Sequence, residues 1–119
     1  MNVHQEETMI DLAVKKCLPI LAGTPALDRA QVFALLGGVS GWEVNASASE
    51  LTRNFDFKDF HQSMGFANAV AWVANLENHH PEMEVAYKKC VVRYSTHAVK
   101  GLSENDFICA AKIDRLLSA

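Results

Sequence analysis

The residues best suited to chemistry in this chain are a group of histidines in its C-terminal third and one nearby acid. His79 and His80 are adjacent and are followed by Pro81, and His97 and Asp106 stand further on. Imidazole is the side chain whose unperturbed pKa lies close enough to neutrality both to give and to take protons at working pH. The group therefore suggests proton-transfer chemistry on a small organic molecule. An Asn-His-His-Pro run is also an ordinary way for a chain to leave a helix, and the spacing alone leaves both interpretations open.

The composition is that of one soluble globular domain. The sequence has 119 residues, of which 50% are hydrophobic and 21% charged, so it can bury about two-thirds of the surface of its unfolded chain. The formal net charge of -3 offers no basic face to a phosphate backbone, which argues against direct nucleic-acid binding. The apolar run at residues 17–23 is too short to span a bilayer, and the acids before it are unlike a signal peptide. We therefore expect a cytoplasmic protein with neither a membrane nor a nucleic-acid partner.

The cysteines give no sign of a disulfide framework or a structural zinc site. Cys17, Cys90 and Cys109 are odd in number, widely spaced and without a Cys-x-x-Cys pair. Reduced thiols are the simplest expectation for a cytosolic chain. Cys90 and Cys109 stand in apolar segments and are expected to be small core residues.

The first helix that the pattern predicts begins after Asp28 and ends near residue 36. Asp28 can cap its amides, with Gln31 as the capping-box partner, and Gly37 and Gly38 end it. Its apolar stripe comprises Val32, Leu35, Leu36 and Val39.

Four strands are predicted in two pairs. The first pair, 42–44 and 50–57, is joined by small polar residues, and its second strand alternates as a sheet wet on one face requires. The second pair spans about 84–87 and 91–96, with a charged turn at Lys88.

Two further helices are predicted, one between the strand pairs and one at the end. The long helix runs from about Asp59 to Glu77, and its buried stripe is expected to comprise Phe60, Met64, Phe66, Ala67, Val70, Ala71, Val73 and Ala74. The last helix begins at Ser103, with Phe107, Ala110, Ile113 and Leu117 on its buried side.

The order helix, strand, strand, helix, strand, strand, helix predicts an α+β fold. We expect two layers: a four-stranded antiparallel sheet with three helices on one face. Residues 1–26 show little periodicity beyond a weak helical stretch near 9–16, so they are interpreted as a partly ordered arm before a single domain at 27–119. A sheet of this kind leaves at least one edge unpaired, which favours a homodimer or homotetramer.

The histidines belong to a longer pattern. Asn78-His79-His80-Pro81, followed at set spacings by Tyr87, His97 and Asp106, resembles the signature of the pterin-4a-carbinolamine dehydratases. Flanking segments agree with that family in order from about residue 27 onward, namely Gly41-Trp42, Phe55 to Phe60, Gly65-Phe66, Ser95-Thr96-His97 and Gly101 to Glu104. The arm, with Lys16-Cys17 before Pro19, is similar to the N-terminal extension of bacterial members.

The resemblance implies a hydro-lyase. Its substrate would be 4a-hydroxytetrahydrobiopterin, which aromatic amino-acid hydroxylases leave behind, and its product quinonoid dihydropterin, in tetrahydrobiopterin recycling. The family pattern implies that His79 and His97 are the acid–base residues and that His80 holds the pterin, with no metal or organic cofactor. Acid–base assistance of this kind is worth on the order of 10² to 10⁴ in rate.

Other residues are candidates for the substrate site. They are Asn75, Asn78, Pro81, Ser95, Thr96, Asp106 and Trp42. Asp106 stands three residues after Ser103, so it opens the last helix as a capping box, steers a histidine, or does both. Trp42 is either a core anchor, which is favoured, or a wall of the pterin site. His61 and His4 are expected to be solvated.

Asn75 departs from the family pattern, which usually has an ionisable residue, often Glu, four positions before the first histidine. An amide can hydrogen-bond but cannot supply the negative charge that favours imidazolium. Glu77 lies roughly 200° further around the helix and is not an obvious substitute. The rate or the pH optimum could differ for this reason.

Two other classes of function compete with the enzyme. A protein-binding module is the main alternative, because animal members of the family also act as dimerisation cofactors for a homeodomain transcription factor. A regulatory partnership with an aromatic amino-acid hydroxylase belongs to the same class. A metalloprotein using His79, His80 and His97 is disfavoured, since adjacent loop histidines usually diverge and no carboxylate or cysteine completes the set.

Overall fold

The structure is a computed structural model that describes residues 11–118. Its α-helices are α2 (Arg29–Leu36), α3 (Phe60–Glu77) and α4 (Glu104–Arg115), with 3₁₀ turns η1 (Leu12–Val14) and η2 (His97–Val99). Its strands are β1 (Glu43–Val44), β2 (Leu51–Asp56), β3 (Glu82–Ala86) and β4 (Lys89–Tyr94). They form one antiparallel sheet in the order β1-β2-β4-β3, so the predicted α+β fold is confirmed.

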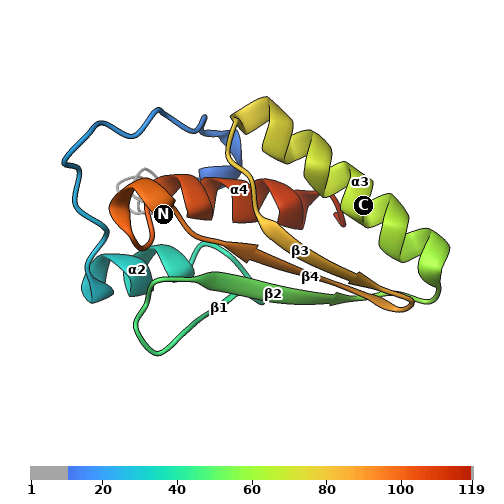
Figure 1. Ribbon diagram of the computed structural model, residues 1–119. Coiled ribbons are helices and arrows are strands. Elements are labelled where there is room, and N and C mark those ends of the chain that lie inside the picture. Colours follow the sequence, from blue (N-terminus) through green and yellow to red (C-terminus); the bar gives the residue numbers. More distant parts are fainter. Residues whose placement is uncertain (1–10, 119) are drawn as a thin grey trace, which may run out of the picture.

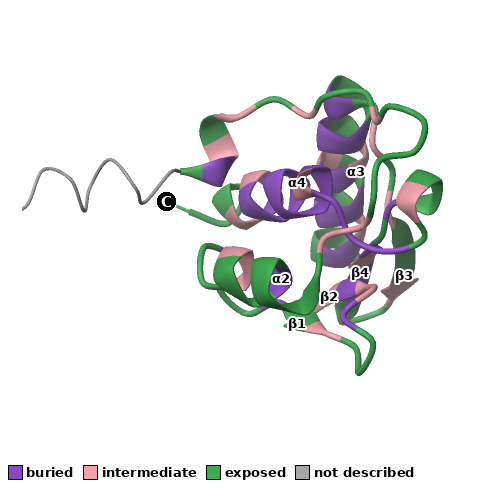
Figure 2. Ribbon diagram, turned by 90° about the vertical axis from the view of Figure 1, so that its left-hand side faces the viewer, coloured by how far each residue is buried: buried purple, intermediate pink, exposed green. Residues whose placement is uncertain are grey.

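The core lies between the sheet and the two longer helices. Figure 1 shows α3 and α4 covering the same face of the sheet. In Figure 2 the buried positions concentrate in α4 and in the strands and helix faces turned toward it. Central strand β4 contributes Val92 and Tyr94, and its neighbour β2 contributes Leu51 and Phe55. The buried side chains of β2 and β4 fill the space between the sheet and the two helices.

The first helix forms as the sequence predicts. The Asp28 side chain accepts from the Gln31 amide, and the Gln31 side chain accepts from the Asp28 amide, which completes the capping box. Val32 is fully buried, and the helix ends at Gly37.

Helix α3 also begins where predicted, with Asp59 as its N-cap. The prediction that its apolar stripe is buried from its first residue is wrong. Phe60 is 49% exposed. Ser63 already contacts the turn that closes β3 and β4 by donating to the Tyr87 carbonyl, so Phe60, one helical turn earlier, extends past the sheet. Leu117 is likewise exposed, because α4 ends at Arg115 before reaching it.

The second strand pair lies earlier in the chain than predicted. Strand β3 begins at Glu82 and β4 ends at Tyr94. Thr96 lies beyond β4 and pairs only with Gly101, through an isolated bridge that closes the loop around η2. This loop brings the chain from the sheet to the start of α4.

The segment before α2 packs along α4. Lys112 Nζ donates to the Ala13 carbonyl at 2.8 Å, and Asn105 exchanges two hydrogen bonds with the backbone of Leu18. His4 and the first two residues of the predicted 9–16 helical stretch lie outside the described residues, and Leu12–Val14 forms only a 3₁₀ turn. Between residues 11 and 118, no helix is both long and apolar enough to cross a membrane.

Candidate active site

His79 is held in place by the end of α3 and by β4. Asn78 adopts the left-handed conformation (φ 51°) and caps α3, and the next amide, that of His79, donates to the Ala74 carbonyl at 3.1 Å. The Tyr94 hydroxyl donates to the His79 carbonyl at 3.1 Å. The Tyr94 ring also stacks on the imidazole, with 5.1 Å between centroids. Both backbone groups and one face of the ring are therefore fixed before any ligand arrives.

The His79 imidazole meets the carboxylate of Asp106. Its Nε2 lies 2.6 Å from Asp106 Oδ1, and the Asp106 side chain is fully buried while that of His79 is 14% exposed. The second oxygen, Oδ2, accepts from the Thr96 hydroxyl at 2.8 Å and from the Ser103 amide at 2.9 Å. Both alternatives for Asp106 therefore hold, since it completes the capping box of α4 and contacts a histidine.

The pair changes the protonation of His79. Burial of the ring disfavours imidazolium, but the hydrogen bond and the negative charge of Asp106 outweigh burial and raise the pKa of His79 above its ordinary value. A carboxylate accepts, so Nε2 carries the proton of this bond. Nδ1 has no hydrogen-bond partner among residues 11–118, which leaves it free to exchange a proton. A histidine in this state can act as a general acid near neutral pH.

His80 is turned toward α3. It is exposed, and its Nε2 lies 3.2 Å from Oδ1 of Asn75, in the last turn of the helix. The amide therefore hydrogen-bonds this histidine without adding charge. Pro81 follows, half-buried, and leads directly into β3.

His97 is carried by a segment that the same carboxylate anchors. Thr96 is the N-cap of η2, which begins at His97, and the Thr96 hydroxyl bonds to Asp106 and to Ser103 Oγ. His97 and Ser95, on either side of Thr96, are exposed. Asp106 thus joins the loop that carries His79 to the loop that carries His97. The Thr96 hydroxyl is buried and already bonded within the protein.

Trp42 lies in the core. It is 4% exposed, its Nε1 donates to Asp114 Oδ1 at 2.8 Å, and its ring meets Phe55 edge-on. This placement favours the core alternative for Trp42.

Sequence reasoning missed two residues near the site. The sequence pattern predicts for Tyr94 only a place in a strand, and helix geometry gives Glu77 no obvious role toward the histidines. The Glu77 carboxylate is 4% exposed and accepts from the Cys17 amide at 2.8 Å and from Lys16 Nζ at 3.2 Å. Burial opposes its charge, but these partners and Lys112 lower the pKa of Glu77. A negative charge at the last position of a helix is unfavourable to the helix dipole. The position of Glu77 therefore indicates that a specific cationic or amide partner stabilises its carboxylate.

The described chain also has an open groove that none of the candidate site histidines lines. An open groove of about 480 Å³ is lined by Phe57, Gln62, Gly65, Phe66, Ala69, Leu116 and Leu117. Over residues 11–118, no three His, Cys, Asp or Glu side chains converge closely enough to hold a metal ion.

Comparison with known proteins identifies a family that the chain matches over most of its length. Residues 25–116 match the family model described as pterin 4 alpha carbinolamine dehydratase. The chain belongs to this family. A relative from Nitrosospira multiformis is 47% identical over 111 residues, which span 93% of this chain and 96% of the relative. One from Nitrosomonas eutropha is 50% identical over 108 residues, spanning 90% and 94%. Both carry the name pterin-4-alpha-carbinolamine dehydratase provisionally.

Solved structures agree with the fold. A protein from Brucella melitensis, described as a transcriptional coactivator/pterin dehydratase, is 32% identical, with a TM-score of 0.72 over 76% of this chain and 97% of that chain. A pterin dehydratase-like protein described as a RuBisCO assembly factor of the alpha-carboxysome is 19% identical, with a TM-score of 0.57 over 66% and 92%. The second likeness shows the shared fold alone.

Proposed function

We propose that the protein dehydrates 4a-hydroxytetrahydrobiopterin to quinonoid dihydropterin, in tetrahydrobiopterin recycling in the cytoplasm. The observation that carries the proposal is the contact between His79 and the buried Asp106, which keeps an imidazolium available near neutral pH. Family membership supplies the substrate class. We further propose that residues 27–119 form the dehydratase domain and residues 1–26 its arm.

The reaction requires two proton transfers. The bond between C4a and its hydroxyl oxygen breaks as a proton reaches that oxygen and water leaves, and a second proton departs from a ring nitrogen. His79, charged through Asp106, gives the proton to the leaving hydroxyl. His97, exposed at the start of η2, takes the proton from the ring nitrogen. His80 holds the pterin, and Asn75 orients the His80 imidazole through their hydrogen bond.

Further pterin contacts come from groups beside these histidines that are exposed or half-buried. Ser95, Asn78 and Pro81 flank them in sequence and offer polar groups and a rigid backbone to the flat ring. Thr96 and Asp106 act one step back, by holding the two histidine loops together. Trp42 takes no part, because it is enclosed in the core.

A direct assay tests this proposal. The protein is mixed with enzymically generated 4a-hydroxytetrahydrobiopterin, and the quinonoid product is followed by absorbance. Replacement of His79 or His97 by Ala should lower kcat by about 10² or more, and His80→Ala should mainly raise KM. His61→Ala is the matched control, because His61 is exposed on α3. Unchanged acceleration in both His79→Ala and His97→Ala would refute the assignment.

A second role, as an interaction module, has its own supporting observation. Helix α3 exposes Trp72 (67%) and Leu76 (60%), which stand about one turn apart on one face, and also Phe60 (49%) at its start. We propose a second copy of this chain as the partner, so that the protein is a homodimer or homotetramer. Sedimentation should show an oligomer that Trp72→Glu dissociates. A monomeric wild type that instead binds an aromatic amino-acid hydroxylase or a transcription factor would favour a heterologous partner.

A further inference from the structure

Two cysteines that are far apart in the sequence face each other in the fold. The Sγ atoms of Cys17 and Cys109 lie 3.7 Å apart, across 92 residues of chain. Cys17 belongs to the segment that packs along α4, and Cys109 lies on α4 itself. Both are free thiols, Cys17 half-buried and Cys109 fully buried.

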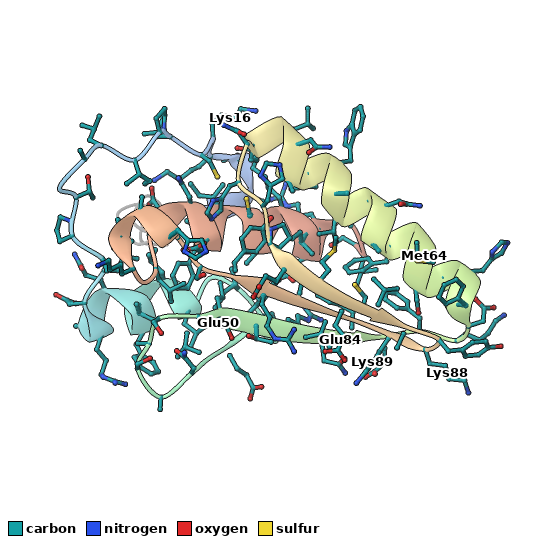
Figure 3. All side chains as sticks on the ribbon, viewed as in Figure 1. Lys16, Glu50, Met64, Glu84, Lys88 and Lys89 are labelled. Carbon is teal, nitrogen blue, oxygen red and sulfur yellow. The ribbon has the colours of Figure 1, made fainter. Side chains whose placement is uncertain are left out.

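The approach of the two sulfurs is held from both sides. The Cys17 amide donates to the buried carboxylate of Glu77 at 2.8 Å, and the next residue, Leu18, exchanges two hydrogen bonds with Asn105. Lys16 pairs with the same Glu77, and Figure 3 shows Lys16 beside the C-terminal end of α3. The backbone around Cys17 is therefore fixed by contacts with α3 and α4 that do not involve the Cys17 thiol.

The two thiols differ in acidity. A hydrogen bond from Cys17 lowers the pKa of Cys109, against the effect of burial, and Tyr94 and the charge of His79 act in the same direction. The hydrogen bond with Cys109 and burial raise the pKa of Cys17. The thiolate is the reactive form, so the lowered pKa favours Cys109 as the nucleophile of the pair, with the Cys17 sulfur 3.7 Å away to react second.

We propose that Cys17 and Cys109 are a peroxide-sensitive thiol pair that closes into a disulfide and locks the arm onto α4. The Cys109 sulfur attacks one oxygen of hydrogen peroxide, the O–O bond breaks, and water leaves after taking up a proton, which gives a sulfenic acid. The Cys17 sulfur then attacks the Cys109 sulfur, the S–O bond breaks, and a second water leaves. Two thiols and one peroxide yield one disulfide and two waters, so the peroxide is the oxidant and the thiols are oxidised.

The surroundings select the kind of oxidant. Cys109 is fully buried and Cys17 is half-buried, so a small neutral oxidant such as hydrogen peroxide is favoured over the bulky disulfide of glutathione. The site needs no pterin, so the inference stands independently of the proposed function. Cys109 follows Asp106 by one helical turn, which places the new bond beside the residues that hold His79.

Mass spectrometry tests the proposal on the full chain. After treatment with hydrogen peroxide and blocking of free thiols, trypsin digestion should yield a peptide in which Cys17 and Cys109 are linked, and a reductant should abolish it. The link should raise the thermal midpoint by roughly 10 °C, because it closes a long loop. Both effects should be absent in Cys17→Ser and present in Cys90→Ala, the matched control with a buried thiol elsewhere.

Two outcomes would overturn the inference. One is treated wild-type protein in which Cys17 and Cys109 are both alkylated or singly oxidised, with no linked peptide. The other is a link that joins two copies of the chain through Cys17. Faster closure with glutathione disulfide than with hydrogen peroxide would contradict the assignment of buried Cys109 as the first thiol to react.

Discussion

Asp106→Asn is the substitution that probes the site most deeply. The carboxylate accepts from His79 Nε2, the Thr96 hydroxyl and the Ser103 amide, and it is fully buried. Asparagine has the same shape, but its amide group turns one acceptor into a donor. At least one of the three donors then loses its partner. Hydrogen bonds to charged groups contribute about 1.5–3 kcal/mol each, so we expect a loss of about 2–4 kcal/mol in the free energy of unfolding.

The pH dependence of this loss has a defined sign. Asp106 raises the pKa of His79 in the folded state, so the pair stabilises fully below the unfolded value of about 6.5 and loses that contribution as pH rises through the folded pKa. Urea unfolding of the wild type should therefore show stability falling across this window. Asp106→Asn should flatten the fall, and NMR titration of its His79 should give a lower pKa than in the wild type.

A second acid on the same helix supplies the control. Asp114 is part-buried and accepts from Trp42 and Arg53 rather than from a histidine. Asp114→Asn should lower stability while leaving the His79 titration unchanged. The reasoning fails if Asp106→Asn leaves the pKa of His79 unchanged or raises it.

Substitutions at three further positions have expected outcomes. Asn75→Glu places a carboxylate where an amide now lies 3.2 Å from His80 Nε2, so NMR titration should show a raised His80 pKa, and an unaltered pKa would mean that the two side chains do not meet in solution. Glu77→Gln removes the charge that pairs with Lys16 and Lys112, which should cost roughly 2 kcal/mol in urea unfolding at neutral pH and much less as pH falls through the lowered pKa of Glu77; equal losses at both pH values would argue against the ion pairs. Tyr94→Phe deletes the hydroxyl bond to the His79 carbonyl but keeps the stacked ring, so it should cost about 1 kcal/mol, whereas Tyr94→Leu should cost more; equal effects would exclude a contribution from the stack.

Local chemistry was enough to predict most of the elements. Asp28 with Gln31, Asp59 and Ser103 with Asp106 each begin a helix because a side chain satisfies amides only a few residues away. The buried positions of β2 follow from its alternation. Phe60 and Leu117 could not be placed this way, because their exposure depends on where the sheet and α4 end.

The site depended on longer-range contacts. The resemblance grouped His79 with Asp106, but the bond between Nε2 and Oδ1 joins residues 27 apart and exists only once α4 packs against α3. The burial of Glu77 and the approach of Cys17 to Cys109 depend on the segment before α2, where periodicity was too weak to predict a path.

The central claim is that His79, His80 and His97 act on one bound pterin. NMR titration of the imidazoles with a stable oxidised pterin tests it directly. If the three histidines share one site, their resonances should all shift with a single dissociation constant, while those of exposed His61 on α3 should not change. A titration in which only one of the three responds, or in which His61 shifts equally, would contradict it.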